Sequence, residues 1–449
     1  MKAKYLLITL AMLVGFSLNA EKFKYDGMRY RGEIVKEYDV SDRGNLVMKE
    51  IHGDVKIVGE ARNNILVTER YSINAYSESS AEKIFQESRA RYFLKGNTLV
   101  VEGAPDTRRY QSDFLIKVPS NFNIDVGASG GDLVAEKITG AVEMHTSGGD
   151  IDILEIRGTL HVNTSGGDIN IRQCGDEVTA TTSGGDIVCH KIVGTLLAKT
   201  SGGDISVENL NGDGEVRTSG GDIYISHISG KHFAGSTSGG DIGADDVDAD
   251  LKLSTSGGDI DVGRIGSNVR LHTSGGDIEV EEVNGNLDAS TSGGDITVEK
   301  TAGYCSVNTS GGNIDLGTVM DKVRATTSGG DIYMSSVYGS VYAHTSGGDV
   351  ELRKELHKGI KDNSIDLSSS GGDIYLSVPD NIKADVFAQI IVYDKWDKNE
   401  IRSDFPLDIT QEQRGSKLII TGEGSINGGG DEITLKTSGG DIKINRLIQ

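Results

Sequence analysis

The sequence has 449 residues, and its 67 Asp and Glu outnumber its 45 Lys and Arg to give a formal net charge of −22. A chain this acidic is a poor partner for nucleic acid or an anionic membrane surface, because both carry the same sign of charge. Its 61 Gly and only 4 Pro argue against collagen and against a Pro-rich linker, and favour an ordered chain with many tight corners.

Residues 1–20 have the pattern of a cleaved secretory signal peptide. Lys2 and Lys4 form a basic start, an almost wholly apolar run extends to Leu18, and Ala20 offers a small residue at the cleavage site. The run is short for a bilayer span, so a membrane anchor is the less favoured alternative. No later stretch is apolar enough to cross a membrane. We therefore expect an exported protein in the periplasm, at the cell surface or secreted, with no transmembrane segment in the mature chain.

Residues 21–127 are β-rich but irregular, and we expect them to cap one end of the fold. One helix is predicted over Ser80–Arg91, with Ser79 or Ser80 as its N-cap. The segment Ile51–Ile57 contains Gly-Asp-Val and reads as a degenerate copy of the later repeat. Strand-like runs occur at Ile65–Thr68, Thr98–Glu102, Phe114–Val118 and Phe122–Val126.

Residues 128–378 carry a regular internal repeat built on Ser-Gly-Gly-Asp. Thirteen consecutive copies follow one another at intervals of 18 residues, with one interval of 19. A step of 24 residues leads to the next copy, and a last copy stands apart near the C-terminus. The fourth motif position is held by Asp132, Asp150, Asp168, Asp186, Asp204, Asp222, Asp241, Asp259, Asp277, Asp295, Asn313, Asp331, Asp349, Asp373 and Asp441.

Each 18-residue unit predicts two short strands and two corners. In the unit Thr146–Asn163, apolar residues alternate with polar ones from Ile151 to Ile153 and again from Leu160 to Val162, with Gly158 between. Units of equal length favour parallel coils in which every strand pairs with its copy about 4.8 Å away. The expected fold is therefore all-β, a single-stranded parallel β-solenoid (β-helix), for which right-handed is the commoner hand. The unit has no six-residue subperiod, which argues against a left-handed hexapeptide solenoid.

The three Cys and the C-terminal residues fit this register. Cys174, Cys189 and Cys305 fall at apolar-face positions, so we expect buried thiols and no disulfide framework. Residues 379–449 hold the single Trp, Trp396, and two of the four Pro, and we expect a C-terminal cap followed by a last coil.

The Thr-Ser-Gly-Gly-Asp corner invites a structural and a metal-binding interpretation. The Gly pair permits unusual backbone angles and close approach of coils, and the Thr hydroxyl can bond from coil to coil. The Asp side chains point outward, where stacked carboxylates repel by about 0.9 kcal/mol per pair in water. Hydrogen bonds from corner N–H groups or Ser hydroxyls would offset that repulsion, and Asn313 in one copy favours this explanation. Calcium between coils is the alternative, with candidate ligands Asp150, Asp168, Asp186, Asp204 and Asp222.

Catalytic chemistry finds little support in this pattern. A uniform carboxylate column does not provide the two different environments that an acid–base pair requires, so we expect no catalytic residues, no cofactor site and no enzyme activity. His145, His272 and His344 share one position but lie on distant coils. The exceptions to uniform coil length are Lys231–Ser236, Glu351–Ser364 and the C-terminal segment. Outward tyrosines gather toward the C-terminal coils, with Tyr304 among them, and the candidate contact patch consists of Tyr333, Tyr338, Tyr342 and Tyr375.

The repeated Ser-Gly-Gly-Asp-Ile units behind a signal peptide, with the last turn INGGGDEITLKTSGGDIKI, resemble the bacterial putative-adhesin family of β-strand repeat proteins, a domain of unknown function. The resemblance implies a parallel β-solenoid at the envelope or cell surface and transfers no functional residue. We expect a non-enzymatic exported adhesin or cell-envelope scaffold that binds a repetitive partner, such as polysaccharide, or a surface protein through many weak contacts. The alternatives are a calcium-stabilised β-roll-like surface protein and a polysaccharide-active β-helix enzyme.

Overall fold

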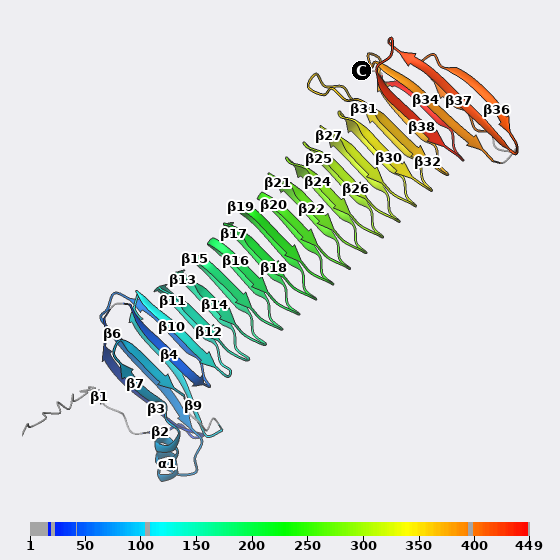
Figure 1. Ribbon diagram of the computed structural model, residues 1–449. Helices are drawn as coiled ribbons and strands as arrows, with labels where there is room; N and C mark the ends of the chain where they lie inside the picture. Colours follow the sequence, from blue (N-terminus) through cyan, green and yellow to red (C-terminus); the bar gives the residue numbers. More distant parts are fainter. Residues whose placement is uncertain (1–16, 19–22, 42, 104–107, 394–397, 448–449) are drawn as a thin grey trace, which may run out of the picture. The chain divides into compact units, whose positions relative to one another are not determined.

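The computed structural model describes residues 23–41, 43–103, 108–393 and 398–447, together with Ser17–Leu18. These residues are nearly all β, and their strands pair mainly in parallel (Figure 1). The chain divides into two compact units, Met1–Gly185 and Asp186–Gln449, which are described in turn. Apart from Ser17–Leu18, the predicted signal peptide lies outside the described residues, as does Trp396. Among the described residues, no helix has the length and apolar character needed to span a bilayer.

The regular coils of unit 1 confirm the parallel β-solenoid. Ile151 pairs with Ile169 in one column of strands and Leu160 with Val178 in the other, so each strand lies beside its copy 18 residues later. The inward side chains of both columns are buried, which gives a continuous apolar core. The strands are β11 (Leu133–Thr139), β13 (Ile151–Arg157), β12 (Val142–His145), β14 (Leu160–Asn163) and β15 (Ile169–Thr181), which spans both columns.

The cap of unit 1 continues both strand columns and then closes them with antiparallel strands. One column runs β11, β5 (Val55–Glu60), β9 (Tyr110–Pro119), β6 (Asn64–Ile73) and β3 (Tyr30–Asp39). The other runs β12, β10 (Phe122–Ala128), β4 (Gly44–Ile51), β8 (Thr98–Glu102) and β7 (Arg91–Lys95). Short strands β1 (Ser17–Leu18) and β2 (Lys24–Tyr25) pair with β3. All four predicted strand runs are confirmed, and so is the degenerate unit, because Val55 aligns with Leu133.

The predicted helix is confirmed, but its ends were placed too late. Helix α1 covers Glu78–Ser88, and its N-cap is Ser77, whose side chain accepts the Ser80 N–H at 3.2 Å. Neither Ser79 nor Ser80 is the cap, because burial of one helix face fixes the start. That face packs Ala81, Ile84 and Phe85 against Tyr71 and Tyr110. Arg91, the predicted end, begins β7 instead.

Unit 2 repeats the same coil over a longer stretch. Its first column contains β17 (Ile205–Asn211), β21 (Ile260–Ile265), β23 (Ile278–Val283), β25 (Ile296–Thr301), β27 (Ile314–Val319), β29 (Ile332–Val337), β31 (Val350–Lys354) and β33 (Ile374–Pro379). Its second contains β18 (Gly214–Arg217), β22 (Val269–His272), β24 (Leu287–Ser290), β26 (Cys305–Asn308), β28 (Val323–Thr326), β30 (Val341–Thr345) and β32 (Ile365–Ser369). Strands β16 (Ile187–Lys199), β19 (Ile223–Ser236) and β20 (Ile242–Ser254) span both columns.

Two irregularities account for the unequal repeat intervals in unit 2. The 19-residue step produces a register shift between β19 and β20 at Ser229/His232, where the extra residue lets both Lys231 and His232 donate backbone N–H groups to Asp213 Oδ1. The 24-residue step forms a loop over residues 355–364 between β31 and β32.

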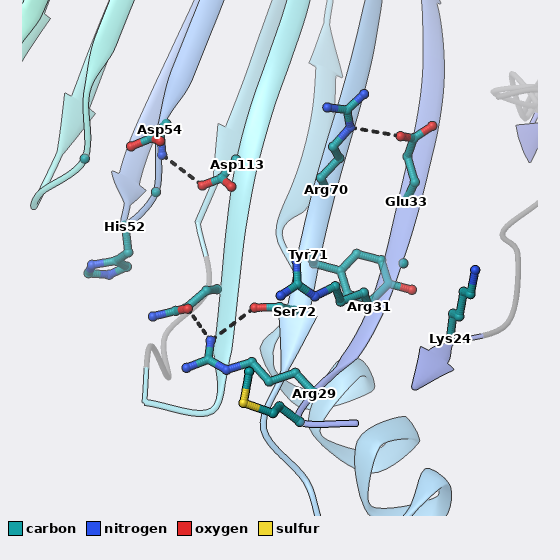
Figure 2. Close-up of a pocket in the computed structure, with 15 residues that line it drawn as sticks. Lys24, Arg29, Arg31, Glu33, His52, Asp54, Arg70, Tyr71, Ser72 and Asp113 are labelled. Carbon is teal, nitrogen blue, oxygen red and sulfur yellow. Dashed lines mark hydrogen bonds and ion pairs between the residues drawn. The ribbon is translucent and has the colours of Figure 1, made fainter. Parts of the chain in front are cut away.

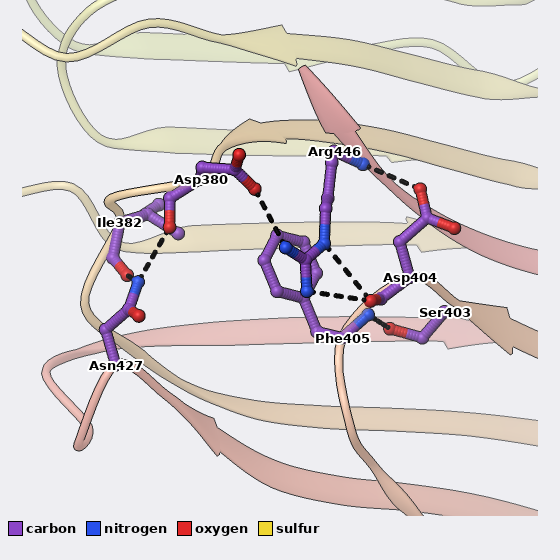
Figure 3. A network of polar contacts seen from close by, with 7 residues as sticks. All are labelled: Asp380, Ile382, Ser403, Asp404, Phe405, Asn427 and Arg446. Atoms are coloured by element: carbon purple, nitrogen blue, oxygen red, sulfur yellow. Dashed lines mark hydrogen bonds and ion pairs between the residues drawn. The ribbon is translucent and has the colours of Figure 1, made fainter. Parts of the chain in front are cut away.

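The cap of unit 2 adds strands to both columns, and a network of polar contacts stabilises them. Strand β38 (Asp431–Thr437) lies between β32 and β34 (Ala384–Val392), and β39 (Ile442–Leu447) lies between β33 and β35 (Ile401–Ser403). Antiparallel β37 (Lys417–Ile426) then joins β34 to β36 (Asp408–Arg414). Figure 3 shows the guanidinium of Arg446 between Asp380 and the Asp404 backbone carbonyl, at 3.1 Å from each.

The three cysteines are buried, as the register predicted. Burial raises the pKa of the Cys305 thiol to about 12, so the thiol stays protonated at neutral pH. These thiols lie among the apolar side chains of the core.

Candidate functional site: the repeated corner and the outward faces

The corner threonines bond one coil to the preceding one. Thr273 Oγ1 donates to the carbonyl of Gly258 in the preceding coil at 2.9 Å and accepts the N–H of Gly276 in its own corner at 3.3 Å. The predicted coil-to-coil bonding is confirmed, with a glycine carbonyl as the partner. The same donation is made by Thr146, Thr164, Thr182, Thr218, Thr237, Thr255, Thr291, Thr309, Thr327, Thr345, Ser369 and Thr437.

The two glycines of the motif have different roles. A Cβ on Gly276 would overlap the carbonyl of Gly258 far inside van der Waals contact, whereas a Cβ on Gly275 would lie 3.4 Å from the carbonyl of Gly257. The second glycine is therefore required by the close approach of coils. The expectation of unusual backbone angles is wrong for the regular coils, because neither glycine adopts a left-handed φ there; Gly131, where the run begins, is the exception at +91°.

The aspartates form a hydrogen-bonded ladder on the outside of the corner. The backbone N–H of Asp277 donates to Asp259 Oδ1 at 2.8 Å, and the N–H of Asp295 donates to Asp277 Oδ1 at 2.8 Å. Asn313 takes part equally, because its amide oxygen accepts the Asp331 N–H at 2.9 Å. An acceptor oxygen, rather than a negative charge, is thus what the position needs.

The five calcium candidates belong to this ladder. Asp150 accepts the N–H of Asp168 at 2.8 Å, Asp186 accepts that of Asp204 at 2.8 Å, and Asp204 accepts that of Asp222 at 2.7 Å. Asp222 in turn accepts the Asp241 N–H. Nowhere in the described part of the chain do three His, Cys, Asp or Glu side chains gather closely enough to hold a metal ion.

Both caps extend the ladder. In unit 1, Asp54 Oδ1 accepts the Asp132 N–H at 2.9 Å, and Asp113 Oδ1 accepts the Asp54 N–H at 3.1 Å. In unit 2, Asp441 Oδ1 accepts the N–H of Glu400 at 2.9 Å. The corner contact therefore ends at a cap residue in each case.

A polar groove lies beside Asp113 and Asp54 in the cap of unit 1 (Figure 2). Its arginines already have partners: Arg70 Nε lies 3.1 Å from Glu33, Arg31 Nε lies 2.6 Å from Asp26, and Arg29 donates to Ser72 and Gln111. The Arg70 pair joins β6 to β3, and the Arg29 contacts join the turn before β3 to β6 and β9, so the groove residues stabilise the cap.

The four tyrosines of the predicted contact patch lie in three places. Tyr333 and Tyr375 share the first column, two strands apart with Glu351 between them, and the Tyr375 hydroxyl donates to Asp373 at 2.7 Å. Tyr338 lies in the corner after β29, edge-on to the ring of His357. Tyr342 lies on β30 in the second column.

The surroundings of Tyr342 contain residues that the sequence analysis did not identify. Arg324 on β28 and Asp366 on β32 are its register partners, and a surface groove includes all three together with Tyr304. The signal was present in the repeat, since Arg324 precedes Tyr342 by 18 residues and Asp366 follows it by the 24-residue step. Reading one position of the unit down consecutive coils would have found them.

The regions considered for catalysis show ordinary polar contacts. Backbone N–H groups of Lys231 and His232 hold the pKa of Asp213 below its usual range. His272 and His344 each pair with a serine hydroxyl of the next coil at 2.9 Å. These contacts connect neighbouring coils.

Comparison with known proteins supports the family resemblance. Residues 188–321 match the family model described as Toastrack DUF4097, which confirms the resemblance drawn from the Ser-Gly-Gly-Asp-Ile repeats. A search of the curated proteins finds no match.

Three solved structures are similar at low identity. A putative adhesin from Bacteroides fragilis is 14% identical, with 60% of this chain and 96% of that chain covered and a TM-score of 0.27. A putative cell adhesion protein from Clostridium sporogenes is 9% identical, with 93% and 100% covered and a TM-score of 0.16. A putative lipid binding protein from Parabacteroides distasonis is 13% identical, with 78% and 97% covered and a TM-score of 0.15. At these values the likeness assigns no function.

Proposed function

We propose that this chain, which carries the Toastrack DUF4097 match at residues 188–321, is a non-enzymatic exported β-solenoid of the cell envelope or cell surface. It acts in adhesion or as a scaffold by binding a repetitive polymer, with polysaccharide as the favoured partner.

The observation that carries this proposal is the fixed register of outward side chains. In the second column of unit 2, Arg270, Asp288, Ser306, Arg324 and Tyr342 occupy the same position on consecutive strands. Neighbouring positions are about 4.8 Å apart, so a polymer lying along the column meets a polar side chain at each step. Many weak contacts of this kind add up to useful avidity.

The carboxylates support a binding role over catalysis. An acid–base pair needs two carboxyl groups whose environments separate their pKa values, as in glycoside hydrolysis. The corner aspartates instead repeat one environment, in which each Oδ1 accepts a backbone N–H. Glu69, a carboxyl with a strongly different setting, is fully buried and accepts the Tyr110 hydroxyl at 2.7 Å within the cap of unit 1.

Binding of the purified full chain to insoluble and immobilised polysaccharides tests the proposal, with reducing-end release measured in the same samples. We expect retention that strengthens with polymer length and no release of reducing ends. Absence of retention on every polysaccharide and on intact bacteria would refute the binding role, and release of oligosaccharides would replace it with an enzymatic one.

Cell fractionation with surface proteolysis tests the location. We expect the chain in the envelope fraction or the medium. A chain confined to the cytoplasm would contradict export.

A further inference from the structure

The groove around Tyr342 is lined by two partly exposed tyrosines. Tyr304, just before β26, and Tyr342, on β30, are 36% and 37% exposed, and both line it. Strand β28 separates β26 from β30, so the two tyrosines are about 10 Å apart along the stack. Two aromatic side chains at this separation can contact two different, non-adjacent rings of one oligosaccharide.

Neighbouring side chains hold the tyrosine in place and supply polar groups. The guanidinium carbon of Arg324 lies 4.5 Å from the centre of the Tyr342 ring, a cation–π contact that restrains the ring. Asp366, on the other side of Tyr342 in the same column, is exposed. A donor and an acceptor therefore flank one aromatic ring, which is the arrangement that a sugar with several hydroxyl groups can use.

The charges lining the groove balance. Lys322 and Arg324 supply two positive groups, and Asp366 and Glu432 supply two negative groups. Such a lining has no net attraction for an anionic or a cationic ligand. A neutral ligand that both donates and accepts hydrogen bonds satisfies both kinds of group.

The groove also lies where the coils stop being uniform. Ser364, at the end of the 355–364 loop, lines it, and Asp362 of that loop lies 3.8 Å from Lys322 Nζ. The buried Lys354 fixes the start of the loop, because its ammonium donates to the carbonyls of Val337, Tyr338 and Glu355. The insertion is thus anchored at one end and contributes to the groove at the other.

We propose that this groove is a binding site for a neutral oligosaccharide. Tyr304 and Tyr342 pack against the apolar faces of two sugar rings, while Arg324 donates to sugar hydroxyls and Asp366 accepts from them. The inference rests on the proposed polysaccharide-binding function and assigns to it a place and a ligand class.

Calorimetric titration of the full chain with cellohexaose, xylohexaose and chitohexaose, and with oligogalacturonate as the acidic probe, tests this site. We expect at least one neutral hexasaccharide to bind, and Tyr304→Ala or Tyr342→Ala to weaken that binding by about tenfold or more. The matched control is Tyr224→Ala, which removes an exposed tyrosine from the first column, on β19, and should leave the affinity unchanged. Melting curves identify any variant that fails to fold, and Arg324→Gln provides a second variant that keeps both rings.

The outcomes separate the groove from the wider proposal. If the chain retains polysaccharide but Tyr304→Ala, Tyr342→Ala and Arg324→Gln all bind as the wild type does, the groove is refuted and the polymer-binding function stands. Binding of oligogalacturonate alone overturns the neutral ligand class. If the wild type binds neither polymer nor oligosaccharide, the proposed function itself has failed.

Discussion

The regular coils and the caps solve the same problem of holding strands together in different ways. In a coil, one small set of contacts recurs, as in the bonds from Thr273 to Gly258 and from Asp277 to Asp259. In the caps, the contacts do not recur, and each is formed by one particular pair, such as Tyr110 with Glu69 in unit 1 and Arg446 with Asp380 in unit 2. Outward positions differ from coil to coil while the corner contacts and the buried apolar positions recur, whereas each cap depends on particular pairs.

The most severe test of this contrast is the second glycine of a corner. Gly276→Ala places a methyl group against the Gly258 carbonyl, so adjacent coils must separate. We expect a loss of about 3 kcal/mol or an insoluble product. Gly275→Ala is the control, since its methyl group meets only ordinary contact and should cost far less. Equal melting temperatures for the two variants would show that close approach does not hold the coils.

The buried lysine before the cap of unit 2 predicts a specific pH dependence. Burial lowers the pKa of Lys354 to about 8, against 10.5 for an exposed lysine. Between these values the unfolded chain binds more protons than the folded one, so the stability of the wild type rises with pH across this window. The gain relative to Lys354→Met is at most about 3 kcal/mol, because each pKa unit corresponds to about 1.4 kcal/mol.

Melting temperatures of both proteins from pH 7 to pH 10.5 measure this difference. We expect the wild-type value to increase relative to the variant as the pH rises. Parallel curves, or a wild type that loses stability relative to the variant, would contradict a buried ammonium.

Two buried threonines distinguish the contribution of the corner hydrogen bonds to stability from the contribution of burial alone. Thr273 forms the two corner hydrogen bonds, whereas the Thr301 hydroxyl, at an apolar position beside the Cys305 thiol, has no nitrogen or oxygen partner among the described residues. Thr273→Val should destabilise by about 1–2 kcal/mol, and Thr301→Val should be neutral or stabilise by up to about 1 kcal/mol. Denaturant midpoints of both variants check the signs, and equal losses would remove the special role of the corner.

Much of the fold was predictable because the same pattern of apolar, polar and glycine positions recurs in every unit. A position such as Ile151 is supported by its copies, so strand columns, buried cysteines and the Asp acceptor role followed from the period. The start of the helix did not follow from the sequence, because Ser77, Ser79 and Ser80 can all serve as N-cap and tertiary packing determines which of them does. The need for the second glycine of the motif was not predictable either. It follows from the distance between neighbouring coils, and the sequence of one unit does not contain that distance.

The candidate site was predicted in part for a related reason. Tyr342 stood out by residue type, but Arg324 and Asp366 are unremarkable until they are aligned on neighbouring strands. A surface site on a solenoid is formed by residues from neighbouring strands of one column. These residues are therefore distant in sequence and share only their position in the repeat unit.

The smallest effect is expected for changes to the corner aspartates. This prediction tests the central claim, which is that the corner is a hydrogen-bonded structural element and that function belongs to the outward faces. The measurement is the melting temperature of the wild type and of the triple variant Asp259→Asn, Asp277→Asn, Asp295→Asn, with chelator and with added calcium. Each amide retains the acceptor oxygen, as Asn313 does, so we expect a change of about 1 kcal/mol or less and no response to calcium or chelator. A wild type that melts higher with calcium, together with a variant that does not, would show that the column binds metal and would contradict the account.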